Sequence, residues 1–419
     1  VLGFVQFKGF AHAIQVIRGK FDDPNDPGEI SHFQALCTAL SATVGLGNIA
    51  GVGVAVHMGG PGAVFWMIIT GLVGMSTKFS ECSLSLMYRK VDERGIVHGG
   101  PMYYIERGLG EKWKPLATFF AFAVICASFG ASNMFQTNQV ASILSTNFNV
   151  PKALTGLVLA ILTAIVIIGG IKRIGQVTGF LVPFMGGVYV LGSLLVIFLN
   201  YEKIPQLFVD IFTQAFSGTA AFGGFSGIAV KQVIIQGVRR ACFSNEAGLG
   251  SAPIAHAAAS TKEPIREGVV ALLEPFIDTV VICTMTALVI LIAGPWTQLR
   301  GVELTAAAFD SSLPGFGTFF VSLAVLLFAY STLLSWSYYG EQAVRYLWPH
   351  KEKHLLVYKL LFCVLAFVGA IWKLGPVLSF SDIMLGIMVV PNLFSVLMLL
   401  PRLRKESQRY FLKLKNKEF

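Results

Sequence analysis

Hydrophobic positions in this chain form long continuous stretches and do not alternate with polar ones. A helix of about 20 residues crosses the hydrocarbon core of a bilayer, and ten stretches are about that long or longer. They cover 33–56, 63–88, 116–148, 153–171, 176–199, 207–236, 268–294, 318–346, 355–372 and 376–400. The pattern predicts an all-α integral membrane protein that crosses the bilayer many times.

Basic residues mark every second loop between these stretches. The poorly charged loops carry only Lys152, Lys203, Arg300 and Lys373. The other loops and the tail carry groups such as Arg89, Lys90 and Arg94, Lys172 and Arg173, Arg239 and Arg240, and seven lysines and arginines after residue 400. Positive loops stay in the cytoplasm, so we expect a multi-pass cell-membrane protein with both core termini cytoplasmic.

Composition excludes several other classes. The chain is 54% hydrophobic and 13% charged, whereas soluble domains carry about 25% charged residues. The net charge of +9 is divided among loops, so we predict no nucleic-acid partner. Each of the six cysteines lies alone in or beside an apolar stretch, which indicates packing and neither zinc nor disulfides. No nucleophile elbow or phosphate loop indicates an enzyme.

Two glycine-rich segments stand at matching places. The first and sixth stretches contain ATVGLGNIAGVGVA, around Gly45–Gly53, and FSGTAAFGGFSGIA, around Gly218–Gly227. Each leads a group of five stretches, and five is odd, so the second group starts from the opposite side. We therefore predict a 5+5 inverted repeat with discontinuous first and sixth core helices. The predicted parts are a cytoplasmic N-terminal segment 1–32 whose preceding helix is missing, repeats 33–199 and 200–400, and a basic cytoplasmic tail 401–419.

Interrupted helices carry function for a physical reason. Unwinding frees backbone N–H and C=O groups in the bilayer, where leaving them unpaired costs several kcal/mol each. Freed N–H groups suit a carboxylate, and freed carbonyls suit Na⁺. An amino acid together with Na⁺ supplies both partners, although glycine runs also simply allow tight packing.

Several motifs resemble known transporters. VGLGNIAG (44–51) resembles the first-helix signature of the leucine-transporter fold. Further motifs, spread along nearly the whole chain, resemble the alanine or glycine:cation symporter family. They are GNIAGV, GGPGAVFWM (59–67), GGPMYYIERGLG (99–110), FSNEAGLGSAPIAHAA (243–258) and DTVVICTMTAL (278–288). The resemblance implies Na⁺-coupled symport of alanine or glycine by alternating access, in the bilayer and without an obligate protein partner.

The resemblance also implies a sodium site between the first and eighth helices. Its ligands would be the carbonyls of Ser41 and Val44 and the hydroxyls of Ser331, Thr332 and Ser335, since hard cations prefer oxygen. The alternative is that these hydroxyls bond to their own helix backbone.

The substrate is expected to bind at the two interruptions. The predicted lining is Gly45, Leu46, Gly47, Asn48, Gln136, Phe222, Gly223, Gly224, Phe225, Ser226 and Trp336. Trp336 would limit the cavity to small side chains, or else serve packing alone. Asn48 would hold a second Na⁺ or order the interruption.

Charged residues within the stretches leave further alternatives. Lys78 and Glu81 are three residues apart and can form a structural ion pair. Asp278 has a possible part in the cation path or in gating, while Glu246 and His256 have no assigned chemistry.

The rival functions within transport are a proton-coupled amino-acid transporter and a transporter with broader specificity for neutral amino acids. A buried carboxylate at the substrate site would argue for proton coupling. A channel is the rival from a different class.

Overall fold

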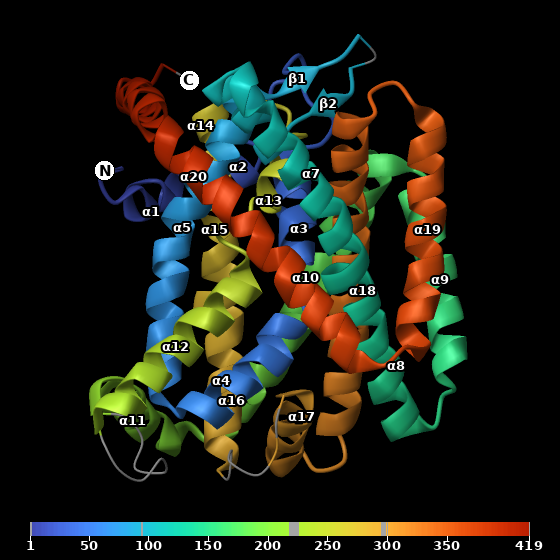
Figure 1. Cartoon of the computed structure of the whole chain (residues 1–419). Helices are drawn as coiled ribbons and strands as arrows, with labels where there is room; N and C mark the ends of the chain where they lie inside the picture. The colour runs from blue at the N-terminus through green and yellow to red at the C-terminus, as the bar shows by residue number, and fades with distance from the viewer. Residues whose placement is uncertain (1, 94, 218–225, 295–298, 300, 419) are drawn as a thin grey trace.

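The structure is a computed structural model that describes residues 2–93, 95–217, 226–294, 299 and 301–418. It is a bundle of helices of which several cross its whole height, and both chain termini lie at the same end (Figure 1). We call this the terminus end. A short antiparallel hairpin of β1 (Lys90–Val91) and β2 (Val97–His98) also lies there.

The described first half of the chain contains both long and short helices. Their bounds are α1 Val5–Lys8, α2 Phe10–Ile17, α3 His32–Thr43, η1 Gly47–Gly51, α4 Val52–Gly59, α5 Gly62–Tyr88, α6 Pro101–Tyr103, η2 Tyr104–Gly108, η3 Glu111–Trp113, α7 Lys114–Phe129, η4 Gly130–Met134, α8 Phe135–Phe148, α9 Lys152–Ile167 and α10 Gly170–Leu199.

The second half repeats this mixture of long and interrupted helices. Its bounds are η5 Tyr201–Lys203, α11 Ile204–Ser217, α12 Ser226–Asn245, α13 Ala252–His256, α14 Pro264–Ala271, α15 Leu273–Pro275, η7 Phe276–Cys283, α16 Thr284–Ala293, α17 Gly301–Ser312, α18 Gly317–Leu347, α19 Glu352–Ile371 and α20 Leu374–Lys415.

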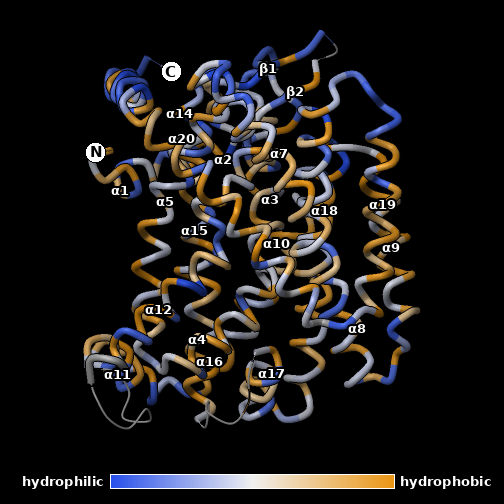
Figure 2. The backbone as a smooth tube through the Cα atoms, in the orientation of Figure 1, coloured by the Kyte–Doolittle hydropathy of each residue, from blue (hydrophilic) through white to orange (hydrophobic). Residues whose placement is uncertain are grey.

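Among the described residues, seven helices are long and apolar enough to cross a membrane. An eighth span results if the bent pair of α3 with η1 and α4 is counted as one, and α9 is a shorter apolar helix. The predicted span 207–236 runs over residues outside the described part, so the count of ten remains a prediction. Apolar residues cover the outer helices α9 and α19 (Figure 2), where Leu157, Ile161, Leu356 and Leu360 are exposed as lipid-facing residues should be.

The predicted interruption of the first helix is confirmed. Helix α3 ends at Thr43, Val44 takes an extended conformation with ψ of 92°, and the axis bends by 52° before α4. Glycine at position 45 suits this geometry, because a Cβ there would lie 3.0 Å from the Thr332 Oγ1 atom.

The sixth segment differs from its prediction. The glycine run at 218–225 lies outside the described residues. Helix α12 continues to Asn245, nine residues beyond the predicted end of that span at 236. Lys231, Arg239 and Arg240 interrupt the hydrophobic pattern there, although the backbone stays helical. The chain then leaves the helix over 246–251 and forms α13.

A single arginine ties the loops of the terminus end together. Arg89, directly after α5, donates to the carbonyls of Pro27, Ala257, Ala259 and Thr261 at 2.5–2.8 Å. Ser260 N–H also donates to the Ile30 carbonyl at 2.9 Å. The segment before α3 and the segment after α13 are therefore held by the same side chain.

Candidate functional site

The interruption of the first helix is the centre of the candidate site. Gly45 N–H, which has lost its helical acceptor, donates to the Asn48 side-chain oxygen at 2.8 Å. Asn48 thus orders the interruption, one of the two roles expected for it. Gly47 packs against the last turn of α12, because a Cβ on it would lie 3.1 Å from the Ser244 Cα atom.

The residues predicted to bind sodium lie together on the α18 side of the interruption. The hydroxyls of Ser331 and Thr332 each donate to the Ser41 carbonyl at 3.1 Å. Ser335 contacts the Ser41 hydroxyl and donates to the Thr38 carbonyl at 2.6 Å. All of these side chains are buried, and Val44 is buried directly beyond them.

This oxygen set suits a small hard cation. Ser331 and Thr332 also reach the Phe328 carbonyl one turn back, at 2.8 and 3.0 Å. Each hydroxyl can therefore turn its proton toward its own helix and offer a lone pair to an ion beside the Ser41 carbonyl. Bonding to the helix's own backbone and ion binding are thus compatible at these two positions.

A second polar group lies on the other side of Asn48. Its amide donates to the Asp278 carboxylate at 2.6 Å and to the Asp278 carbonyl at 3.1 Å. Ser244 and Thr279 donate to the same carboxylate at 3.2 and 2.7 Å. The buried carboxylate of Asp278, on η7, therefore lies beside the interrupted first helix. The sequence indicated no carboxylate in the first and sixth helices themselves.

The end of α12 supplies a third part of the site. Glu246 has the left-handed φ of 54°, and Gly248 and Gly250 have φ of 95° and 79°. Such angles are strained for glutamate, but its carboxylate accepts from Ser251 at 2.5 Å and from the Trp336 indole N–H at 3.2 Å. Residues 246–251 of the motif FSNEAGLGS thus form a largely buried, irregular turn.

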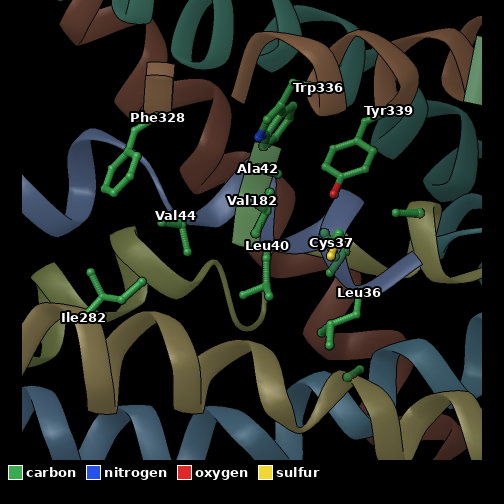
Figure 3. Close-up of a cluster of buried hydrophobic side chains, with 14 of the residues drawn as sticks. Leu36, Cys37, Leu40, Ala42, Val44, Val182, Ile282, Phe328, Trp336 and Tyr339 are labelled. Atoms are coloured by element: carbon green, nitrogen blue, oxygen red, sulfur yellow. The ribbon is translucent and has the colours of Figure 1, made fainter. Parts of the chain in front are cut away.

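Trp336 is fully buried and stands with Tyr339 above the first helix (Figure 3). The two rings are 5.3 Å apart, edge to face. Figure 3 also shows Ala42 and, further away, Leu40 of the first helix below the Trp336 ring in this view. The indole thus bridges the interrupted first helix and the irregular turn after α12, which is more than packing against apolar neighbours.

The remaining predicted residues are less well placed. Gln136 on α8 is buried, and its side-chain oxygen has no hydrogen-bond partner among the described residues. Leu46 is buried at the interruption. Phe222, Gly223, Gly224 and Phe225 lie outside the described residues, and Ser226 begins α12. The structure adds Ser244 and Glu246 to the site and places Asp278, for which the sequence suggested a part in the cation path or in gating, against Asn48.

A cavity of about 590 Å³ approaches the interruption from the end opposite the termini. Ala50 and Val54 line it from the first helix, Gln139 from α8, and Glu303 and Asp310 from α17. A cavity lined by both polar and apolar side chains therefore reaches η1 and α4 of the interrupted first helix.

Comparison with known proteins agrees with this architecture. The model of the sodium:alanine symporter family matches residues 1–419. The chain belongs to the sodium:alanine symporter family. The "Sodium/alanine symporter AgcS" of Methanococcus maripaludis is 47% identical over 405 residues, which cover 95% of this chain and 88% of AgcS. Members of the family are transporters, so the prediction of no enzyme is confirmed.

Two further proteins are similar to this chain. The Bacillus subtilis protein YrbD is 38% identical over 411 residues, which cover 94% of this chain and 84% of YrbD. Its name describes YrbD as a sodium/proton-dependent alanine carrier. The crystal structure of MhsT in complex with L-phenylalanine has a TM-score of 0.57 at 13% identity, covering 89% of this chain and 98% of MhsT. This likeness confirms the leucine-transporter-type fold.

Proposed function

We propose that this family member couples Na⁺ to the uptake of a small neutral amino acid, alanine or glycine, by alternating access. The observation that carries the proposal is the convergence of the Ser331 and Thr332 hydroxyls on the Ser41 carbonyl, directly beside the interruption at Gly45. A cation bound there joins α3 to α18, so ion binding and helix position are linked. Na⁺ and the amino acid are both cargo.

The amino acid binds between the interrupted first helix and the irregular turn after α12. Leu46 and Gly47 lie at the N-terminal end of η1, and the positive end of a helix suits the carboxylate of the substrate. Carbonyls of the 244–251 turn and the Asp278 carboxylate suit its ammonium group. Every α-amino acid satisfies these contacts, so selectivity has to come from the side-chain cavity.

Trp336 supplies the wall that selects small side chains. It is fully buried and its indole is fixed by Glu246 at 3.2 Å and by the Tyr339 ring. A ring held at both ends cannot turn aside, and each added methylene in such a pocket costs roughly 1–3 kcal/mol. Alanine and glycine fit this limit, whereas leucine and phenylalanine exceed it.

The orientation follows from charge and from the shape of the two ends. We place the terminus end in the cytoplasm of the cell, because its loops carry most of the basic residues. The 590 Å³ cavity then opens toward the exterior, while Arg89 and its four carbonyls close the cytoplasmic side. Substrate enters through that cavity, and release requires the Arg89 side to open.

The test is counterflow of labelled alanine in proteoliposomes with and without a Na⁺ gradient. We expect accumulation that follows the Na⁺ gradient and is blocked by unlabelled glycine. Equal accumulation with K⁺ in place of Na⁺ would contradict sodium coupling. Equal competition by leucine would instead replace the small-substrate proposal with a general neutral amino-acid symporter.

Proton coupling is the second candidate, and the buried Asp278 carboxylate favours it. Its contacts with Asn48 and Ser244 place a titratable group at the interruption. Alanine accumulation driven by a pH gradient in Na⁺-free medium would support this candidate. The channel alternative is set aside, because the family consists of symporters.

A further inference from the structure

A row of buried ionisable side chains leads from the terminus end into the bundle, apart from the transport site. It begins with His32 at the start of α3, passes through Glu267, His256 and Glu274, and ends at Lys78 on α5. Their side chains are at most 1% exposed. Burying so many charges costs several kcal/mol each unless they are paired, and packing alone does not require them.

The five side chains contact one another strictly in series. His32 Nδ1 contacts Glu267 Oε2, and Glu267 Oε1 lies 2.5 Å from His256 Nδ1. His256 Nε2 lies 2.7 Å from Glu274 Oε1, and Lys78 Nζ donates to Glu274 Oε2 at 3.1 Å. Each imidazole and each carboxyl group uses one atom toward the preceding residue and its other atom toward the next.

The outer end of the row lies close to water. His32 Nε2 is buried and has no hydrogen-bond partner among the described residues. Asp22 Oδ1 stands 4.0 Å from it, and the Asp22 side chain is 47% exposed. A proton or a water molecule that arrives at Asp22 therefore meets a histidine nitrogen that is otherwise unused.

The charges of the cluster do not balance. The buried carboxyl groups of Glu81 and Glu246 also act electrostatically on Lys78. Four carboxylates then face one lysine and two histidines, so negative charges outnumber positive ones even with both imidazoles protonated. A buried excess charge is costly, and a proton on one carboxyl group removes it.

The surroundings of the row do not cancel this excess. The other titratable and charged groups that act on its members are Asp22, Glu81, Cys82, Arg89, Glu246, Asp278 and Tyr339. The one cation among them, Arg89, also acts on Asp26, and the Asp278 carboxylate adds a further negative charge beside Lys78, so the excess remains. Cys82, His256 and Glu274 lie close enough to hold a metal ion, but both His256 nitrogens already contact carboxyl groups.

We propose that this row is a proton path through which the cluster around Lys78 exchanges a proton with the cytoplasm. A proton from water adds to His32 Nε2, and the Nδ1 proton of His32 passes to Glu267 Oε2. Glu267 starts as the protonated carboxyl group of the row, with its proton on Oε1, and His256 starts neutral, with its proton on Nε2. As Glu267 Oε2 gains a proton, Oε1 gives its proton to His256 Nδ1, and His256 gives its Nε2 proton to Glu274 Oε1. One proton enters, no bond to carbon changes, and the Glu274 carboxylate becomes a carboxylic acid.

The consequence concerns how two helices are held together. The Lys78–Glu274 ion pair joins α5 to α15, and protonation of Glu274 removes its charge. The contacts that close the terminus end are then weaker, so the carrier stays open to the cytoplasm for longer. An acidic cytoplasm therefore slows the return of the empty carrier to the state open to the exterior. The transport consequence rests on the proposed symport, whereas the protonation of Glu274 does not.

The test uses right-side-out vesicles with a fixed Na⁺ gradient and an internal pH between about 8 and 6, where histidine titrates. Alanine uptake by the unmodified protein should fall with internal pH, by at most about tenfold per pH unit for a one-proton step. His256→Gln and His32→Gln should remove this dependence. His12→Gln is the control, because His12 is also buried but binds Tyr410, outside the row, at 2.7 Å.

Infrared difference spectra between acidic and alkaline conditions provide a readout without transport. A carboxyl C=O band should appear in the unmodified protein and in His12→Gln, and should be absent from Glu274→Gln. Uptake that ignores internal pH together with no such band overturns the inference. A band without Na⁺-driven uptake contradicts the symport proposal alone. If His256→Gln fails to fold, His32→Gln at the outer end still decides the question.

Discussion

The two polar neighbourhoods of the interrupted first helix differ in charge. On the α18 side, Ser41, Ser331 and Thr332 present only neutral oxygens. On the η7 side, Asn48 meets the carboxylate of Asp278. A neutral set binds a cation by dipoles alone, so its affinity depends on coordination geometry. A carboxylate adds a full charge in a low-dielectric site, so its contribution also depends on its protonation state.

The largest effect should come from removing the charge of the second neighbourhood. Asp278→Asn keeps the size of the side chain but leaves the site without its negative charge. We expect alanine uptake at saturating Na⁺ to fall about 100-fold, since removing one member of a buried charged contact costs 2–5 kcal/mol. Asp210→Asn on α11, a partly exposed aspartate that accepts a hydrogen bond from Gln206, is the control and should behave normally. Undiminished uptake in Asp278→Asn would show that both neighbourhoods act as neutral ones.

Loss of the neutral oxygens should weaken the binding of Na⁺ more than the binding of alanine. In the double variant Ser331→Ala with Thr332→Ala, we expect the Na⁺ concentration for half-maximal uptake to rise about tenfold, since two net hydrogen-bond-sized contacts are lost. Alanine affinity at saturating Na⁺ should change less. Ser337→Ala removes a hydroxyl on the same helix that donates to the Leu334 carbonyl and serves as the control. An unchanged Na⁺ dependence in the double variant counts decisively against this site.

Trp336→Leu tests the cavity between the two neighbourhoods. The shorter side chain should admit leucine as a competitor and weaken alanine about fivefold, because the small substrate loses its packed wall. Competition of labelled alanine uptake by unlabelled leucine measures both effects. Trp66→Leu, at an indole that donates to the Ala215 carbonyl on another face, controls for loss of a tryptophan. Exclusion of leucine by Trp336→Leu would remove Trp336 from the selectivity wall.

The smallest effect should come from the spacing between the first helix and α12. A Cβ at Gly47 would stand 3.1 Å from Ser244 Cα, whereas one at Gly51 would meet only the Arg240 Cδ atom at 4.0 Å. We expect Gly47→Ala to slow uptake about threefold through overpacking and Gly51→Ala to leave it unchanged. Equal rates in the two variants would show that the contact between Gly47 and Ser244 does not position the Asp278 neighbourhood.

Sequence alone predicted the family, the helical membrane fold and the neutral oxygen set around Ser41, because these depend on hydrophobic length and on local motifs. It did not predict the partners of Asn48. Asp278 follows Asn48 by 230 residues, and nothing within a single helix reveals which distant helix will face it. The end of α12 was placed too early for a related reason: Arg239 and Arg240 end the hydrophobic pattern, but they do not end the helix. The ten-helix count, the inverted repeat and the assignment of site residues remain predictions.

The Arg89 contact has a consequence for the speed of turnover. The Arg89 guanidinium binds one carbonyl before α3, that of Pro27, and three carbonyls after α13. An opening that moves the end of α5 away from both segments must break all four bonds, and water can replace them only once the gap has formed. Such a step has a high activation enthalpy, because no new hydrogen bonds form before the old ones break. The turnover rate is therefore steeply temperature-dependent, while the substrate affinity stays nearly constant.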